Sequence, residues 1–415
     1  MSNLHFWRTL GPGLLFSGAA VGVSHLVQST RAGALFGLAL AGIIILINIL
    51  KYPAYRFGVD YGQSTRRSLL AGYRELGVWA PILFCIVILP VAPIILAAIS
   101  ATTAGLLGAI TGIDLSVPVL VAIVIGSTSF LLIWGGYSWL DRVNRILMAF
   151  LIIATLSTTV LVLPNIEWGT LADVSWMSQP ASLLFIIALA GFMPNPLDVS
   201  VPQSIWTVQA EKDVPDDDRA TLSETRKGFL TGYVVTGILA ICFCIMGAGI
   251  MHNSSIEPAS DAVGFATQII ALYGETLGPI PALLAAISAF AVMLSTMFVA
   301  FDAYGKSFTS AYEEISGVRD PVRLRRAYVT IIMSIGISAL SVLIFFLSDF
   351  GQFIDLATSL AFLSAPIIGV LNHLVVTRCA MPDAARPNRA IRIQSLIAIG
   401  VMSVMTAGYF VLNYR

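Results

Sequence analysis

The sequence has few charged residues: Asp, Glu, Lys and Arg make up 11% of its 415 residues, and the formal net charge is zero. A soluble domain usually carries about 25% charged residues, so this composition excludes a soluble enzyme. The basic residues form short clusters between apolar runs, which leaves no extended basic surface for nucleic acid. The chain also lacks the H-E-x-x-H and G-x-S-x-G motifs of common hydrolases, and we expect no enzyme activity.

Cysteine is scarce as well. The four cysteines, Cys85, Cys242, Cys244 and Cys379, all lie in or beside apolar segments. Cys242 and Cys244 are two residues apart, so they point to different sides of a helix. We therefore expect them to pack as inert side chains, and we expect no resident cofactor.

The sequence is rich in long apolar runs. Hydrophobic residues make up 57% of the chain, and the mean hydropathy is +0.87. The runs reach about 20 residues, the length at which a helix crosses a bilayer. They are continuous rather than alternating, so they are not typical of strands. A segment of this kind makes its backbone hydrogen bonds in lipid by forming a helix. The sequence predicts a single-domain, all-α integral membrane protein (1–415) with about eleven spans: 12–32, 35–57, 79–110, 117–136, 142–163, 181–204, 229–251, 279–304, 326–347, 352–376 and 393–413.

The positions of Lys and Arg predict the orientation, because short cytoplasmic loops carry an excess of positive charge. With the N-terminus inside, every Lys and Arg except Arg31 and Arg415 falls on the inner side, Lys51 included. We expect a protein of the cell (inner) membrane with a cytoplasmic N-terminus and an outer C-terminus. On the long inner segment 209–227, Thr221 and Glu224 have the spacing of a capping box that starts the seventh span.

Two spans are interrupted at matching places, five helices apart. The first contains Gly22-Val23-Ser24-His25, and the sixth contains Met193-Pro194-Asn195-Pro196. The prolines remove backbone donors, and the glycine and serine weaken the first helix at the same depth. Paired interruptions indicate an inverted-repeat transporter whose substrate lies between the breaks. The repeats would be about 12–163 and 181–376, with an extra helix at 393–413.

Polar residues gather at the two breaks and form the predicted substrate site: Gly22, Ser24, His25, Gln28, Met193, Asn195 and Asp198. Asp198 is the strongest candidate because an ionisable group within a span is costly; the alternative is a carboxylate that only caps or pairs. His25 titrates near physiological pH, so a His25–Asp198 pair could carry a coupled proton, and the alternative is a histidine satisfied by packing. Asp302, Asp355 and His373, near span ends, are expected to be structural.

Several motifs resemble the Nramp (natural resistance-associated macrophage protein) metal-ion transporters. The opening Gly11-Pro12-Gly13 is similar to the start of that family, residues 31–34 to the segment that closes its first helix, and Met193-Pro194-Asn195 to its MPHN break. Residues 204–209 resemble the stretch that follows. The resemblance implies the LeuT-like fold of 5+5 inverted repeats, with Met193 as a metal ligand.

The chain departs from that family in two places. The family motif DPGN is replaced by residues 22–25, so its metal-binding Asp is absent and His25 falls where the Asn would be. The acidic pair of the third helix has no counterpart in residues 98–103. A metal site made of His25 and Met193, with backbone carbonyls and Asp198, would suit a softer transition metal.

Two functions are expected as alternatives. The first is proton-coupled uptake of a divalent metal cation through the site between the breaks. The second is transport of a small organic solute such as a carboxylate, since half-helix N-termini offer free N–H groups to an anion. A channel is disfavoured because it predicts a continuous polar stripe. The expected partners are the lipid bilayer and a small transported substrate, with no obligatory protein partner.

Overall fold

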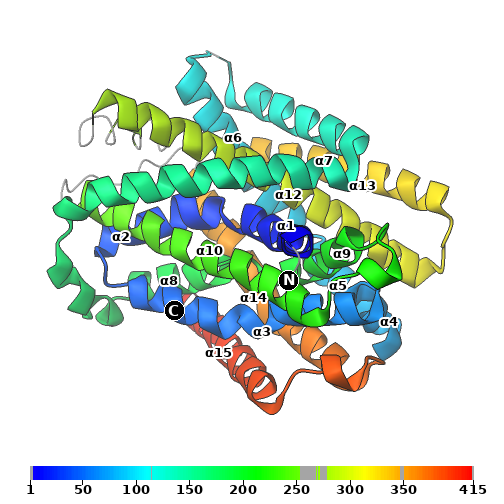
Figure 1. Cartoon of the computed structure of the whole chain (residues 1–415). Helices are drawn as coiled ribbons and strands as arrows, with labels where there is room; N and C mark the ends of the chain where they lie inside the picture. The colour runs from blue at the N-terminus through cyan, green and yellow to red at the C-terminus, as the bar shows by residue number, and fades with distance from the viewer. Residues whose placement is uncertain are drawn as a thin grey trace.

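The structure, a computed structural model, describes residues 3–113, 115–252, 278–345 and 350–413, together with Gln268, Ile270 and Ala271. Within these residues the regular elements are all helical and no strand occurs. The prediction of an all-α fold is confirmed. Figure 1 shows the helices gathered into one bundle, with the two interrupted spans running through its middle.

The first half of the chain forms seven helical segments before the long α7, one of them π-helical. They are α1 (Asn3–Ala20), η1 (Val23–Ser29), α2 (Thr30–Phe36), α3 (Ala41–Thr65), α4 (Leu69–Leu76), α5 (Trp79–Ile88), α6 (Val91–Thr111) and α7 (Val117–Val162). The first span is therefore broken into α1 and the η1–α2 segment, which are bent by 43° relative to each other.

The second half repeats this order with a second interrupted span. Its helices are α8 (Pro180–Phe192), α9 (Ser200–Ala210), α10 (Leu222–Ile250), α12 (Pro279–Ser316), α13 (Pro321–Phe345), α14 (Phe350–Arg378) and α15 (Arg389–Asn413). The predicted capping box is confirmed at the start of α10: the Glu224 amide donates to Thr221 Oγ1, and the Thr221 amide donates to Glu224 Oε2 over 2.9 Å.

The membrane spans can be counted from helix length and apolarity. Among the described residues seven helical segments are long and apolar enough to cross a bilayer, and the bent pair at the start adds an eighth. The 46-residue α7 would extend about 69 Å if straight, against about 30 Å of hydrocarbon. Its length and the non-helical Gly136 fit the two predicted spans 117–136 and 142–163.

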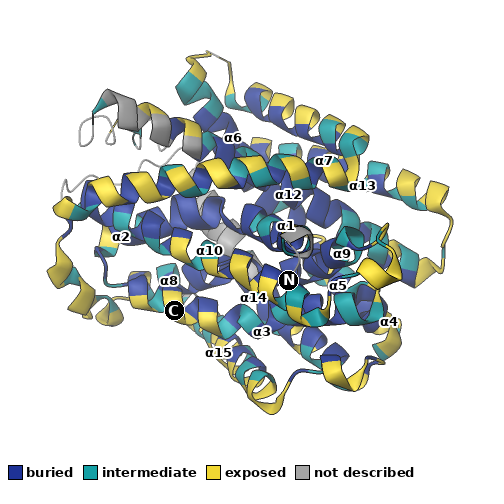
Figure 2. Ribbon diagram, in the orientation of Figure 1, coloured by how far each residue is buried: buried dark blue, intermediate teal, exposed yellow. Residues whose placement is uncertain are grey.

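The interrupted spans occupy the centre of the bundle. In the most apolar part of α8 and α9, 89% of the residues are buried, whereas the corresponding value for α15 is 17%. Figure 2 accordingly shows exposed residues along α13 and α15 and buried ones on α9. Polar groups on these central helices can therefore bond only to neighbouring helices or to a bound substrate.

Small residues allow α1 to pack closely on α10. A Cβ added to Gly232 would lie 2.2 Å from the carbonyl oxygen of Gly13, and one added to Gly228 would lie 2.4 Å from that of Thr9. Membrane helices approach this closely only where side chains are absent. Gly228 and Gly232 of α10 thus allow the first half-helix to pack directly against α10.

Lys51 was counted with the inner-side charges, although it lies inside the predicted span 35–57. In the structure it lies within α3 with 2% of its surface exposed, so it is not an inner-surface charge. Helix α3 also continues past the predicted end at residue 57, and Arg56 and Asp60, one turn apart, form an ion pair there at 3.2 Å. A charged helical segment can therefore continue a span that hydropathy alone would end.

Candidate functional site

The first break separates α1 from η1. The α1 helix ends at Ala20, and Gly22 has φ −139° and ψ −126° before the π-helical segment begins. Thr296 of α12 covers this end, with its hydroxyl 2.9 Å from the Gly18 carbonyl and 3.0 Å from the Val21 carbonyl. A Cβ on Gly22 would approach Thr296 to 2.6 Å. A glycine is required here because the α12 side chain fills the space beside the break.

The second break separates α8 from α9. Helix α8 ends at Phe192, and α9 begins at Ser200 after a short 3-10 turn. Pro194 and Pro196 supply no backbone N–H, so the carbonyls at the end of α8 lack helical partners. Two side chains of α3 donate to them instead. Lys51 Nζ lies 2.8 Å from the Gly191 oxygen and 3.1 Å from the Asn195 oxygen, and the Tyr55 hydroxyl also donates to Asn195.

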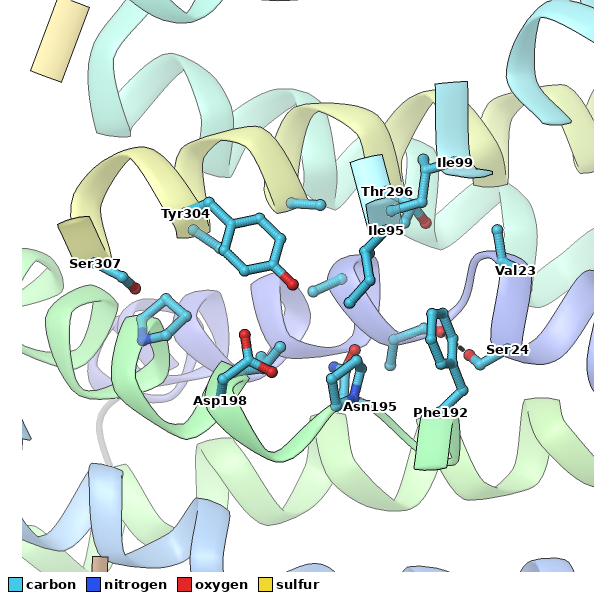
Figure 3. A pocket seen from close by; sticks show the side chains of 17 residues that line it. Val23, Ser24, Ile95, Ile99, Phe192, Asn195, Asp198, Thr296, Tyr304 and Ser307 are labelled. Carbon is cyan, nitrogen blue, oxygen red and sulfur yellow. Dashed lines mark hydrogen bonds between the residues drawn. The ribbon is translucent and has the colours of Figure 1, made fainter. Parts of the chain in front are cut away.

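A small cavity lies between the two breaks. It has a volume of about 30 Å³ and is lined by side chains of α1, η1, α6, the second break and α12. A buried water needs roughly 10–15 Å³ by the same measure, so the cavity has room for one or two waters or one small ion. Figure 3 shows its polar lining, which consists of Ser24, Asn195, Asp198, Thr296, Tyr304 and Ser307.

Asp198 is the one carboxylate in this lining. Its side chain is buried, and its Oδ1 has no hydrogen-bond partner among the described residues. Figure 3 shows the hydroxyl of Tyr304, from α12, pointing toward the carboxylate. A buried carboxylate oxygen without a partner is costly, and it faces a cavity in which a cation or a water can bind it.

The structure brings only some of the predicted site residues to the cavity. Ser24, Asn195 and Asp198 line it, and Gly22, His25, Gln28 and Met193 are absent from its lining. Met193 is fully buried, and Gln28 is buried with neither polar side-chain atom bonded within the described part of the chain.

His25 points away from the cavity toward α10. Its Nε2 lies 3.0 Å from the backbone oxygen of Thr236, and its Nδ1 lies 2.7 Å from the hydroxyl of Ser24. Both ring nitrogens are thus engaged by protein groups. No hydrogen bond or ion pair joins His25 to Asp198 in the described residues.

The residues expected to be structural are placed as follows. Asp302 is 3% exposed and accepts from Trp206 Nε1 at 3.0 Å, from the Tyr328 hydroxyl at 3.1 Å and from Lys306 Nζ at 2.7 Å. His373 lies 3.2 Å from the Ser395 hydroxyl of α15. The side chain of Asp355 lies outside the described residues.

A second, larger pocket, called the vestibule below, lies along α9 and α12 and shares no lining residue with the cavity. It has a volume of about 760 Å³ and is lined by Gln209, Asp302 and Lys306 among others. Arg319 also lines it, and hydrogen bonds to Glu314 and Glu313 raise the pKa of its guanidinium group. The vestibule opens toward the predicted cytoplasmic end, and the buried Asp302–Lys306 pair lies at its wall.

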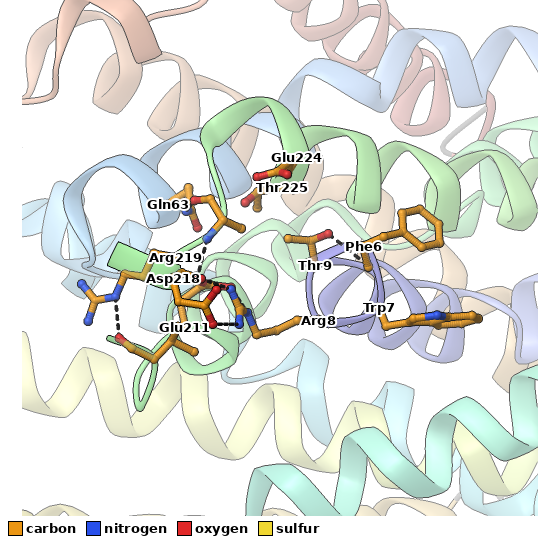
Figure 4. Close-up of polar contacts among 12 residues, drawn as sticks. Phe6, Trp7, Arg8, Thr9, Gln63, Glu211, Asp218, Arg219, Glu224 and Thr225 are labelled. Atoms are coloured by element: carbon orange, nitrogen blue, oxygen red, sulfur yellow. Dashed lines mark hydrogen bonds and ion pairs between the residues drawn. The ribbon is translucent and has the colours of Figure 1, made fainter. Parts of the chain in front are cut away.

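Ion pairs tie the start of α1 to the segment that joins α9 and α10. Figure 4 shows Arg8 reaching this segment: its Nε lies 2.8 Å from Glu211 Oε1, and its Nη2 donates to the Asp218 carbonyl over 2.5 Å. Glu211 also accepts from the Ala220 amide at 3.1 Å. These contacts hold α1 against the segment that follows α9.

Comparison with known proteins places this arrangement in a family. A family model described as natural resistance-associated macrophage protein-like (Nramp) matches residues 13–412. The chain belongs to the Nramp family. An uncharacterized protein of Pasteurella multocida is 31% identical to this Nramp protein over 377 residues, which cover 90% of this chain and 86% of that one.

Solved structures of transporters share the fold. A manganese transporter of Eremococcus coleocola, in complex with an aromatic bis-isothiourea substituted compound, has a TM-score of 0.76 at 15% identity, covering 97% of this chain and 85% of that one. MhsT in complex with L-phenylalanine has a TM-score of 0.67 at 14% identity, with 98% of both chains covered. A Na⁺-coupled sialic acid symporter has a TM-score of 0.57 at 15% identity, covering 96% and 89%. The predicted LeuT-like fold of 5+5 inverted repeats is confirmed.

Sequence reasoning missed Lys51 as a residue of this Nramp site. A signal was present, because Lys51 follows a run of ten residues, 41–50, that contains no charge and one polar side chain, Asn48. A lone lysine after such a run is costly in a membrane and marks a functional candidate. Counting it among the inner-loop charges hid that signal.

Proposed function

We propose that this Nramp protein is a secondary active transporter that works by alternating access, with its cargo bound between the two breaks. The support is geometric: η1 and the second break both line one cavity, and the vestibule lies along α9 and α12. Half-helices that meet at a central site can expose it to either side by rocking. The proposed repeats are about 12–163 and 181–376.

The proposed setting is the cell (inner) membrane, with the N-terminus in the cytoplasm and the C-terminus outside. The distribution of Lys and Arg supports this orientation. Removing Lys51 from the inner loops does not alter it, since the remaining clusters stay on the same side.

The proposed cargo is a divalent metal cation. The observation that carries this proposal is the buried Asp198 carboxylate, which lines the cavity and whose Oδ1 has no hydrogen-bond partner in the described part of the chain. Carboxylate oxygen binds divalent cations well, and family membership supports the same cargo class. His25 and Met193, the ligands suggested by sequence, would have to turn toward the cavity during the transport cycle.

Proton coupling is proposed at the same carboxylate. Asp198 can hold a proton when no cation is bound. The carboxyl group is then neutral, so no unpaired charge is buried in the membrane. In the described conformation His25 is bonded to Ser24 and Thr236. A proton shared between His25 and Asp198 would therefore require a different arrangement of the first break.

A second cargo class, a small organic solute, is favoured by one specific observation. The described residues contain no group of three or more His, Cys, Asp or Glu side chains that could hold a metal ion. In addition, the buried ammonium of Lys51 already offsets the charge of Asp198 at the second break. A divalent ion would add two uncompensated charges, whereas a solute with one ammonium group adds one, and a zwitterion with a carboxylate adds none.

The test is Mn²⁺ uptake into proteoliposomes under an inward proton gradient, with Asp198→Asn beside the wild type. We expect saturable uptake in the wild type and a loss of about 10- to 100-fold in the variant, because a bond to a charged group contributes ~1.5–3 kcal/mol. Asp383→Asn, in an exposed loop, is the matched control and should transport normally. Full uptake by Asp198→Asn would remove this carboxylate from the mechanism.

The organic-solute alternative is decided in the same preparation. If wild-type protein melts cooperatively but takes up no Mn²⁺, the metal proposal fails. Thermal stabilisation of the wild type by amino acids or small amines, absent in Asp198→Asn, would then support the second cargo class.

A further inference from the structure

Lys51 is a lysine buried within a helix that is long and apolar enough to span the membrane. It is the eleventh residue of α3 (Ala41–Thr65), which places it about 15 Å along the helix at 1.5 Å per residue. Its side chain is 2% exposed. An ammonium group at this depth needs strong partners to remain there.

The partners of Lys51 are backbone carbonyls rather than carboxylates. Its Nζ donates to the Gly191 oxygen at 2.8 Å and to the Asn195 oxygen at 3.1 Å. Among the described residues no carboxylate oxygen lies within 4.0 Å of it to form a salt bridge. Tyr55 lies one helical turn further along α3, and its hydroxyl donates to the same Asn195 oxygen. The Tyr55 hydroxyl oxygen is also 3.4 Å from the carbonyl oxygen of Pro196.

These oxygens form the kind of site that binds a free cation. In transporters with interrupted helices, the unwound carbonyls and the C-terminal end of the first half-helix coordinate monovalent cations. Gly191 lies in the last turn of α8, where the helix dipole is negative, and Asn195 lies in the unwound segment. Here an ammonium from the neighbouring helix already occupies that position.

We propose that the ammonium group of Lys51 is a built-in cation of this transporter, occupying the backbone oxygens of the second break where a free alkali-metal ion would otherwise bind. The break then keeps its shape without an external ion, and its carbonyls are not available to one. This inference concerns the break itself and does not depend on which cargo the cavity takes.

An ordinary helix cap is the competing explanation. A lysine near a helix C-terminus can satisfy the last carbonyls and contribute only stability. The two explanations differ when the ammonium is removed, since an exposed ring of oxygens attracts a replacement cation whereas a lost cap has no ion preference.

The experiment is thermal melting of the purified full-length protein in NaCl, KCl or choline chloride at equal ionic strength. We expect the melting temperature of the wild type to be the same in all three salts. Lys51→Met, which keeps the length of the side chain and removes its charge, should melt several degrees lower in choline and regain stability in Na⁺ or K⁺. Lys51→Arg keeps the charge and should show no ion preference.

Controls separate this effect from a general loss of positive charge. Lys227→Met removes an exposed lysine of α10 and should behave like the wild type in every salt. If Lys51→Met does not fold, Lys51→Ala, which also leaves the two carbonyl oxygens without a side-chain donor from this position, replaces it. The proposal is overturned if the neutral variants melt equally in all three salts, or if Na⁺ or K⁺ stabilises the wild type over choline.

Discussion

The hydrogen bonds of His25 show that the position of a residue in the sequence does not tell which way its side chain points. A backbone carbonyl only accepts hydrogen bonds, so Nε2 must be the donor to Thr236. Ser24 has one hydroxyl proton, and its oxygen lies 2.5 Å from the Ala20 carbonyl and 2.7 Å from His25 Nδ1. The imidazole therefore joins the first break to α10 in this conformation, and its predicted role as a metal ligand stays a prediction.

Replacing His25 with Ala tests this role. We expect the free energy of unfolding to fall by roughly 2–4 kcal/mol, because hydrogen bonds are lost and a buried cavity is left. Cargo affinity of the surviving protein should be close to that of the wild type. Thermal melting and Mn²⁺ binding measure the two effects, with His373→Ala, a half-buried histidine outside the cavity lining, as control. Normal stability with lost binding would instead support a ligand role.

At the scale of the element, α7 shows how one residue divides a helix. The sequence predicts two spans, 117–136 and 142–163, with several residues between them. In the structure both remain helical up to Gly136, which alone leaves the helical region with φ +66° and ψ −171°. Figure 1 shows that α7 is not one straight helix. The connection is a single residue because glycine adopts this conformation without a steric penalty.

Gly136→Ala should destabilise the protein through the backbone alone. Nothing lies within 4 Å of a Cβ added at this position, so no clash contributes. The strain of a non-glycine residue in this region is about 1–3 kcal/mol. Gly126→Ala is a matched control on the same helix, again with nothing within 4 Å, and should stabilise by ~0.5–1 kcal/mol. Equal melting temperatures for the two variants would contradict the assignment of strain to Gly136.

At the scale of the whole molecule, the closed state depends on contacts between the two interrupted spans. Arg8 connects α1 to Glu211 and Asp218 beyond α9, and Gln63 of α3 donates to the Ala220 carbonyl at 2.7 Å in the same cluster. Opening toward this end requires that α1 and α9 separate, which breaks these contacts.

Arg8→Gln should favour opening at this end of the bundle. We expect hydrogen exchange in α1 and α9 to rise about fivefold, which corresponds to the ~1 kcal/mol of a partly exposed ion pair. Raising the salt concentration should produce a similar change in the wild type by screening. Arg323→Gln, whose pair with Asp320 is 3.7 Å long and exposed, serves as control. Unchanged exchange in Arg8→Gln would show that packing, not charge, holds this end closed.

Much of the fold follows from the sequence because its signals are local. Apolar run length predicts the spans, Pro194 and Pro196 predict the second break, and Thr221 with Glu224 predicts the start of α10. The candidate site is less predictable. Asp198 was found because a carboxylate in a span is conspicuous, whereas Tyr304 and Thr296 come from a helix distant in sequence and carry no local signal.

The sequence by itself determined that this protein is a membrane bundle with two interrupted helices, since lipid permits few alternatives for apolar segments of this length. The tertiary structure decided which polar groups meet. The π-helical turn of η1 directs Ser24 into the cavity and His25 toward α10, and α3 brings the ammonium of Lys51 to the end of α8. Side-chain direction and contacts between distant helices depend on packing, which no local pattern encodes.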